Sequence, residues 1–310
     1  MDNMKNVLHM DNVTMQFGGV VAVNGLSLDV NEHEIVALIG PNGAGKTTAF
    51  NCVTGIYQPT FGSVSFNGEV ILADTPQGKM RRLYEGDITP TDLTPVRKTP
   101  DQVTKLGIAR TFQNIRLFGA LTVFENVLIA KHMRAKQNVF SATLRLNHAE
   151  EKLMREESME LLEMQGLAHL KNEIASSLPY GLQRRLEIAR ALATSPSLLL
   201  LDEPVSGIDQ NGMDLFYHTI SELKRHYDLA IILISHDLDY VAQYADQVIL
   251  IDGTVKKQGT VRQVYESEEF QEIFGKFDLE NYKPSRQVKE QKEKEIAMPK
   301  HNHSLWKEDV

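Results

Sequence analysis

Residues 40–47 read Gly-Pro-Asn-Gly-Ala-Gly-Lys-Thr, a complete match to the phosphate-binding pattern G-x-x-x-x-G-K-S/T. Residues 35–39, just before it, are all apolar and predict the buried strand that such a loop follows. Glycines let the chain turn tightly, so that backbone N–H groups at a helix N-terminus point toward phosphate oxygens. Lys46 then reaches the β- and γ-phosphates, and the Thr47 hydroxyl can bind Mg²⁺. The predicted phosphate site consists of Gly40, Pro41, Asn42, Gly43, Ala44, Gly45, Lys46 and Thr47.

The bulk composition predicts a globular chain. Of its 310 residues 42% are hydrophobic, and the formal net charge of −8 argues against nucleic acid as the main partner. No stretch approaches the ~18 uninterrupted apolar residues that a membrane-spanning helix needs. The first residues lack the layout of a secretory signal, and the lone Cys52 suits a reducing compartment.

The first quarter of the chain predicts mainly β structure, broken by a helix over residues 46–53 after the phosphate loop. The strand candidates are residues 7–17, 25–30, 35–39, 63–66 and 70–72, with a hairpin turn at Asn67-Gly68. Residues 74–100 are rich in proline and predict an irregular surface insertion, either a partner contact or a decoration of this lineage.

Two capping-box patterns mark helix starts further along, Thr99 with Gln102 and Thr122 with Glu125. The second opens a helical pattern that continues to about residue 166. Beyond it, helices over residues 184–192 and 213–226 alternate with apolar strands; those strands are residues 198–201 and 230–234. This alternation predicts an α/β fold with a mainly parallel sheet covered by helices on both faces.

Several polar side chains are predicted at the carboxyl ends of these strands, the edge where α/β sheets bind ligands. Asp202 and Glu203 follow four leucines; we assign Asp202 to the Mg²⁺ shell with Thr47, and Glu203 to general-base activation of the attacking water. His236 follows the strand at residues 230–234 and is assigned a γ-phosphate contact. The amide of Gln113 is a further candidate for touching Mg²⁺ or that water.

The order of these motifs resembles the ATP-binding subunits of ABC transporters. Four further motifs follow the phosphate loop in the family's order. They are Gln113, the segment Leu178-Pro179-Tyr180-Gly181-Leu182-Gln183, the pair Asp202 and Glu203, and His236. The resemblance covers roughly residues 7–259. Stretches around residues 110–126 and 183–190 resemble those of the ATP-binding subunits in the hydrophobic and branched-chain amino acid uptake group.

The resemblance implies a P-loop NTPase fold of ABC type, with an antiparallel β subdomain and an inserted α-helical subdomain. The implied nucleotide-binding domain is residues 1–284, with its helical part at about 114–182, followed by a charged tail at 285–310. Phe17 would stack on adenine, where relatives more often carry tyrosine, and Val23 and Thr48 are also assigned to ATP. Residues 206–209, including Asp209, resemble the loop that links two opposed sites.

The signature segment departs from the common Leu-Ser-Gly-Gly-Gln, with Pro179 for serine and Leu182 for glutamine. Pro179 lacks a hydroxyl and a backbone N–H but fits the first turn of a helix. Tyr180, Gly181 and the helix N-terminus remain available for the anion. We therefore expect a working but altered contact.

The family resemblance also implies partners. Two such chains, identical or different, pair head-to-tail around ATP and Mg²⁺ at the cytoplasmic face of the inner membrane, where they contact permease subunits served by an extracytoplasmic substrate-binding protein. Residues 114–124 would transmit the motion, with Ile115, Leu117 and Phe118 as apolar contacts. No nucleic acid is expected. The predicted activity is ATP hydrolysis that powers import of branched-chain or other hydrophobic amino acids. The alternatives are another cargo, such as urea or amides, and a soluble ABC-type ATPase that scaffolds assembly.

Overall fold

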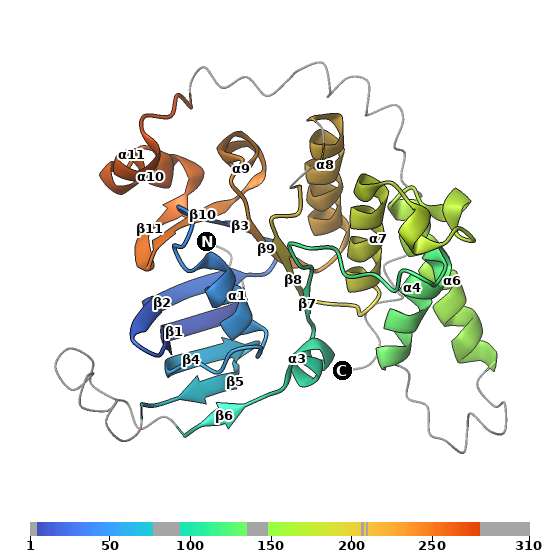
Figure 1. The fold of residues 1–310 in the computed structure, drawn as a ribbon, viewed down its shortest axis with the longest axis horizontal. Coiled ribbons are helices and arrows are strands. Elements are labelled where there is room, and N and C mark those ends of the chain that lie inside the picture. The colour runs from blue at the N-terminus through green and yellow to red at the C-terminus, as the bar shows by residue number, and fades with distance from the viewer. Residues whose placement is uncertain (1–4, 77–93, 135–147, 206–207, 209, 280–310) are drawn as a thin grey trace.

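The computed structural model describes residues 5–76, 94–134, 148–205, 208 and 210–279 (Figure 1). Most of the predicted insertion at 74–100, all of the predicted tail at 285–310, and Asp209 lie outside these residues.

A mainly parallel sheet occupies the centre of the described chain. Its six strands run in the order β11-β10-β3-β9-β8-β7, and only β11 is antiparallel to its neighbour. The strands are β3 (Ile35–Ile39), β7 (Ile108–Arg110), β8 (Leu198–Asp202), β9 (Ala230–Ile234), β10 (Gln247–Asp252) and β11 (Thr254–Thr260). β3, β8 and β9 confirm predicted strands, whereas β7, β10 and β11 were not predicted. β7 has only two apolar residues and β11 is mixed with lysines, which weakens their sequence signal, whereas the four apolar residues 248–251 of β10 were a usable signal that we missed.

A second, antiparallel sheet forms the β subdomain, with its strands in the order β2-β1-β4-β5-β6. Its strands are β1 (Asn6–Phe17), β2 (Val20–Asn31), β4 (Phe61–Phe66), β5 (Glu69–Asp74) and β6 (Val96–Arg97). The predicted hairpin turn is confirmed, since Asn67 and Gly68 both have positive φ between β4 and β5. The expectation of irregular structure up to residue 100 is wrong at β6, which pairs with β5 and extends the sheet.

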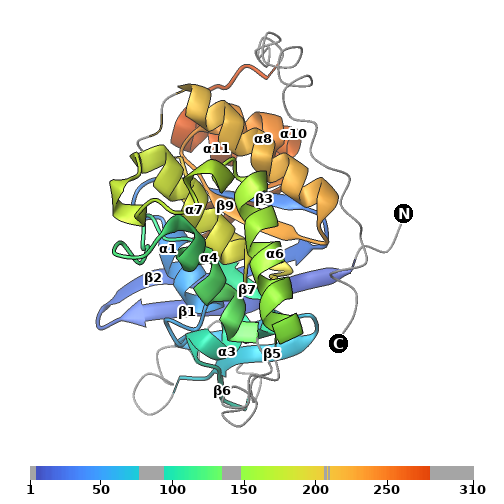
Figure 2. The ribbon, with the colours of Figure 1, turned by 90° about the vertical axis from the view of Figure 1, so that its right-hand side faces the viewer.

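Helices surround these sheets, and three of them lie together at one side of the molecule (Figure 1). That side faces the viewer in Figure 2 and carries α4 (Val123–Lys131), α6 (His148–Met164) and α7 (Tyr180–Leu192). The other helices are α1 (Lys46–Val53), α3 (Pro100–Leu106), α8 (Gln210–His226), α9 (Leu238–Tyr244), α10 (Val261–Tyr265) and α11 (Glu268–Phe274). Both predicted capping boxes are present, at α3 and α4.

The described residues pack into two hydrophobic clusters, one on each face of the parallel sheet. Alternate side chains of β3 go to opposite clusters: Ile35, Ala37 and Ile39 pack beneath the helices, while Val36 and Leu38 pack against α1 and the antiparallel sheet. Side chains alternate faces along a strand, so burial on both faces requires a continuous apolar run. The phosphate loop begins directly after β3, at the centre of this packed sheet.

Among the helices of the described residues, none has the length and apolar character needed to cross a membrane.

Candidate nucleotide site

The phosphate loop connects β3 to the first turn of α1, as predicted. Gly45 is the residue before α1 and has a φ of 95°, a left-handed conformation that favours glycine. A Cβ at Gly45 would lie 2.6 Å from the carbonyl oxygen of Ala22, and one at Gly40 would collide with that of Ile251. These two glycines let the loop lie close to neighbouring backbone just before the N-terminus of α1, where N–H groups favour anions.

Lys46 is buried beneath this loop. Its Nζ donates to the carbonyl oxygens of Gly40 at 2.6 Å and Pro41 at 2.8 Å. Burial lowers the pKa of Lys46, while the charges of Glu203 and Asp202 act in the opposite direction. The ammonium is thus oriented by its own loop and lies within the electrostatic reach of both acids, a position suited to phosphate oxygens.

Three predicted catalytic side chains meet beside the loop. Glu203 follows β8, and its Oε2 accepts a hydrogen bond from Gln113 Nε2 at 2.9 Å. Its Oε1 lies 3.1 Å from Nε2 of His236, which follows β9. The φ of Glu203 is 46°, uncommon for a residue with a Cβ and a kind of strain that collects at functional sites. The sheet therefore assembles the trio because β7, β8 and β9 end at one edge.

Asp202, the predicted metal ligand, is the last residue of β8 and is almost fully buried. Burial raises the pKa of its carboxyl, and the hydrogen bond and charge of Arg110 act against that increase. Nη2 of Arg110 lies 2.7 Å from Oδ2 of Asp202. We did not predict this contact. Arg110 directly follows the apolar residues Ile108 and Ala109, and a cation in that position could have indicated a buried ion pair.

The donor set suits Mg²⁺. Thr47, Asp202 and Gln113 offer hydroxyl, carboxylate and amide oxygens, which are the hard ligands that Mg²⁺ prefers. In the described part of the chain, no group of three or more His, Cys, Asp or Glu residues forms a self-sufficient metal centre.

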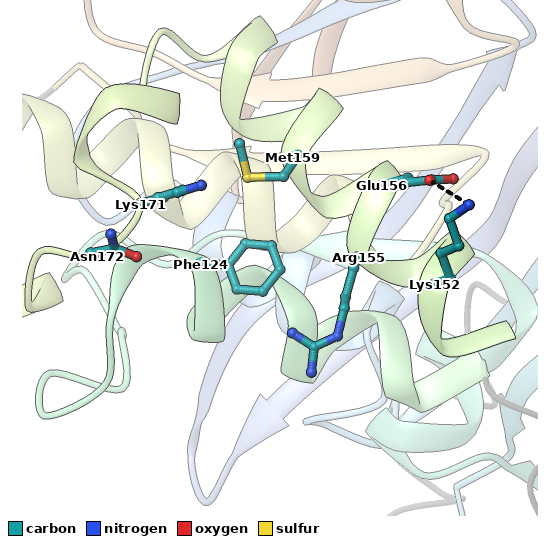
Figure 3. A pocket seen from close by; sticks show the side chains of 7 residues that line it. All are labelled: Phe124, Lys152, Arg155, Glu156, Met159, Lys171 and Asn172. Carbon is teal, nitrogen blue, oxygen red and sulfur yellow. Dashed lines mark ion pairs between the residues drawn. The ribbon is translucent and has the colours of Figure 1, made fainter. Parts of the chain in front are cut away.

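A cavity of about 330 Å³ adjoins the acid end of the site. Its polar wall consists of Glu203, Ser235, His236 and Asp237, and its apolar lining consists of Val205, Ile208 and Met213. A separate hollow of about 430 Å³ lies on α4, α6 and residues 171–172 (Figure 3). Its lining residues are Phe124, Lys152, Arg155, Glu156, Met159, Lys171 and Asn172, and Lys152 pairs with Glu156 at 3.6 Å. None of the predicted nucleotide residues lines this second hollow.

Phe17, predicted to stack on adenine, and Val23, also assigned to ATP, differ in accessibility. Phe17 ends β1 with 42% of its surface exposed, and its ring meets Tyr57 edge-on at 5.1 Å. An exposed ring face remains compatible with stacking. Val23 is wholly buried in β2, and its Cγ2 would lie 2.8 Å from a Cβ at Gly45. Val23 stays a proposed nucleotide residue, and its buried side chain packs against the loop at Gly45.

The signature segment forms the start of α7. This helix begins at Tyr180, four residues before the predicted start, and Pro179 occupies the capping position just before it rather than the first turn. Tyr180 is exposed, and a Cβ at Gly181 would meet open space. The helix N-terminus is therefore accessible, while Asp209 of the linking loop lies outside the described residues.

Arg184 in α7 holds the segment that carries Gln113, a role we did not predict. It is fully buried and donates to the carbonyl oxygens of Phe112 and Gln113, each at 2.7 Å. It also pairs with Glu187 at 2.7 Å, and Glu187 accepts from the backbone N–H of Arg116 at 3.2 Å. A buried charge needs such partners. The sequence offered a signal for this buried pair, because Arg184 and Glu187 are opposite charges three residues apart among apolar helix positions.

Comparison with known proteins agrees with this geometry. A family model described as ABC transporter matches residues 23–206. The high-affinity branched-chain amino acid transport ATP-binding protein LivG of Salmonella typhimurium is 38% identical over 262 residues, covering 83% of this chain and 93% of LivG. BraF of Pseudomonas aeruginosa, named in the same words, is 37% identical with the same coverage.

Solved structures give the same result. The ADP conformation of MJ1267, an ATP-binding cassette of an ABC transporter, is 28% identical with a TM-score of 0.69 and covers 87% of this chain and 98% of its own. The dimeric structure of MJ0796, a bacterial ABC transporter cassette, is 25% identical with a TM-score of 0.62, covering 82% and 99%. The predicted fold class is confirmed. With its phosphate loop, strand-end acids and helical side in the family's arrangement, the chain belongs to the ABC transporter family as an ATP-binding cassette.

Proposed function

We propose that this chain hydrolyses ATP to drive import of branched-chain or other hydrophobic amino acids through a membrane permease. The observation that carries the proposal is the placement of Glu203 between Gln113 and His236, beside the phosphate loop. The cargo is supported by the names of relatives that align over most of their length with this chain.

The tasks of the site residues are proposed as follows. Thr47, Asp202 and Gln113 hold Mg²⁺, which when bound adds positive charge beside the β- and γ-phosphates. Lys46 exchanges its loop carbonyls for phosphate oxygens and neutralises charge there. Glu203 accepts a proton from the attacking water, and Gln113 keeps its carboxylate oriented toward that water. His236, which lies 3.1 Å from Glu203, contacts the γ-phosphate. Thr48 and the loop N–H groups bind phosphate oxygens, and Phe17 stacks on adenine.

A second cassette completes the site in this proposal. The start of α7, with Tyr180 and Gly181, would approach the ATP held by the partner's phosphate loop, and Asp209 would lie between the two sites. MJ0796 forms a dimer, which supports pairing of this related cassette. ATP then favours the closed pair because its phosphates contact both chains only there, and hydrolysis removes that preference.

This chain has a groove of about 340 Å³ between α3, α4 and α7, which is a candidate docking site for the permease. Phe118, Ile129 and Met133 line it and are each 40–49% exposed. Arg190 lies over the Phe118 ring at 5.6 Å, so one wall carries a cation. We assign this groove to a short amphipathic cytoplasmic helix of the permease, which would hold the cassette at the inner membrane. Of the three contacts predicted from sequence, Phe118 lines the groove, while Leu117 packs against the core.

The variant Glu203→Gln tests the assigned base. We expect ATP hydrolysis to fall by roughly 10²–10⁴-fold, the usual contribution of a general base, while binding of Mg-ATP persists. The variant should also pair in Mg-ATP, as measured by analytical ultracentrifugation. Glu163→Gln, on the exposed face of α6, is the matched control. Hydrolysis at the original rate in Glu203→Gln would show that another group activates the water.

Uptake by the assembled transporter tests the cargo. The cassette, its permease and a binding protein reconstituted in vesicles should accumulate radiolabelled leucine, and leucine-loaded binding protein should stimulate ATP hydrolysis. Stimulation by urea or an amide without leucine uptake would replace the cargo but leave the ATPase intact. Failure to sediment with membranes that contain the permease would favour the soluble alternative.

A further inference from the structure

Arg110 is a buried cation to which the proposed chemistry gives no role. It is the last residue of β7, and only 6% of its side chain is exposed. Nη2 donates to Oδ2 of Asp202 at 2.7 Å, and Nη1 donates to Oδ1 of Asn51 in α1 at 2.6 Å. The Asp202 side chain is 3% exposed, so the ion pair is shielded from solvent screening.

Two aromatic rings restrict the guanidinium further. Its central carbon lies 5.5 Å from the centroid of Phe50 in α1 and 5.1 Å from that of Phe112, the residue before Gln113. Cations lie favourably against aromatic faces at such distances. Together with the hydrogen bonds, these contacts tie Arg110 to the helix after the phosphate loop, the acid end of β8, and the Gln113 segment.

A planar guanidinium suits this position because its donors point in fixed directions. One end holds a carboxylate oxygen while the other holds an amide oxygen, and the central carbon lies over the two rings. A lysine ammonium has one nitrogen and cannot reproduce both contacts with the same orientation. The geometry therefore determines where the Asp202 carboxylate lies relative to α1, whose first turn carries Thr47.

We propose that Arg110 is a positioning residue that aligns the Asp202 carboxylate with Thr47 for the nucleotide-bound metal. It touches neither nucleotide nor metal in this role and acts through Asp202. The inference rests on the metal role of Asp202 in the proposed function and is independent of cargo.

Metal binding to the isolated chain tests the proposal without hydrolysis. Mn²⁺ serves as the probe and is followed by electron paramagnetic resonance with saturating AMP-PNP. We expect Arg110→Met to raise the half-saturating Mn²⁺ concentration roughly tenfold, about 1.4 kcal/mol. Affinity for AMP-PNP in EDTA should change less than about threefold, since Lys46 and the loop are untouched. Arg110→Lys should fall between wild type and Arg110→Met.

A double-mutant cycle separates positioning from general damage. In Asp202→Asn, adding Arg110→Met should weaken Mn²⁺ binding no further, because Arg110 acts through that carboxylate. The double variant also removes the unpaired buried charge, so it remains measurable if Arg110→Met folds poorly. Arg116→Met is the matched control, because Arg116 lies over the same Phe112 ring at 4.6 Å but is itself exposed.

The outcomes are distinct. Wild-type Mn²⁺ affinity in Arg110→Met, or equal weakening with and without the Asp202 carboxylate, overturns the positioning role. If Asp202→Asn itself leaves Mn²⁺ binding unchanged, the metal role of Asp202 fails, and with it this inference. A tenfold weakening in Arg110→Met that disappears in the Asp202→Asn background supports the proposal.

Discussion

Lys46 and Arg184 are both buried cations next to the proposed reaction centre, but they are held in opposite ways. The partners of Lys46 are carbonyls five and six residues earlier in its own loop. Those of Arg184 include the carbonyls of Phe112 and Gln113, which lie 72 and 71 residues away, and the buried carboxylate of Glu187. A phosphate can replace the first set of contacts without disturbing the fold, whereas the second set joins α7 to the strand-end segment. The difference separates a cation kept for ligand binding from one kept for architecture.

The largest effect is expected from Arg184→Met. It leaves Glu187 buried without its partner, which costs about 3–5 kcal/mol of unfolding free energy when a buried ion pair is broken. Urea denaturation measures this loss. Arg184→Met with Glu187→Met should recover more than half of it, because no charge remains buried. The neighbouring Arg185→Met is the control; an equal loss there would remove the distinction.

A smaller effect is expected from Lys46→Met, and on binding rather than stability. Loss of its charge-assisted contacts should weaken Mg-ATP binding roughly 100-fold, about 2.7 kcal/mol, within the range for hydrogen bonds to charged groups. The unfolding free energy without nucleotide should change by less than about 1 kcal/mol, since only local loop contacts are lost. Calorimetric titration and urea denaturation give the two values, with the exposed Lys105→Met as control. A stability loss like that of Arg184→Met would break the comparison.

The smallest effect concerns Cys52 in α1, which is buried but carries no charge at neutral pH. Burial raises the pKa of its thiol to about 12 from 9.0. The unfolded thiol loses its proton first, so the folded chain loses stability as the pH rises from 9 toward 12. Relative to Cys52→Ala, the wild-type chain should lose about 1.4 kcal/mol between pH 8 and pH 10.

Urea denaturation under reducing conditions at pH 8, 9 and 10 checks this slope. A stability difference between wild type and Cys52→Ala that stays constant with pH would mean that the thiol is hydrated in the folded chain.

Elements of the fold were predicted correctly where the sequence pattern that marks them lies within a few neighbouring residues. Continuous apolar runs predicted β3, β8 and β9, and the Thr122 pattern predicted the start of α4, because these signals lie within a few residues. β7 spans only Ile108–Arg110 and was missed, although it positions both Arg110 and Gln113. The burial of Val23 within β2 was not predicted either, because it depends on how the antiparallel sheet packs against the loop.

The amino-acid sequence by itself determined the phosphate loop and the strand-end acids, because each lies in contiguous residues. It also determined the family, because several short motifs follow one another in the family's order. Only the tertiary structure decided what surrounds them. The order of β7, β8 and β9 in the sheet brings Gln113 within 2.9 Å of Glu203, 90 residues away, and Arg110 within 2.7 Å of Asp202, 92 residues away. Such contacts depend on which strands become neighbours, and strand order follows from packing the whole chain around two cores.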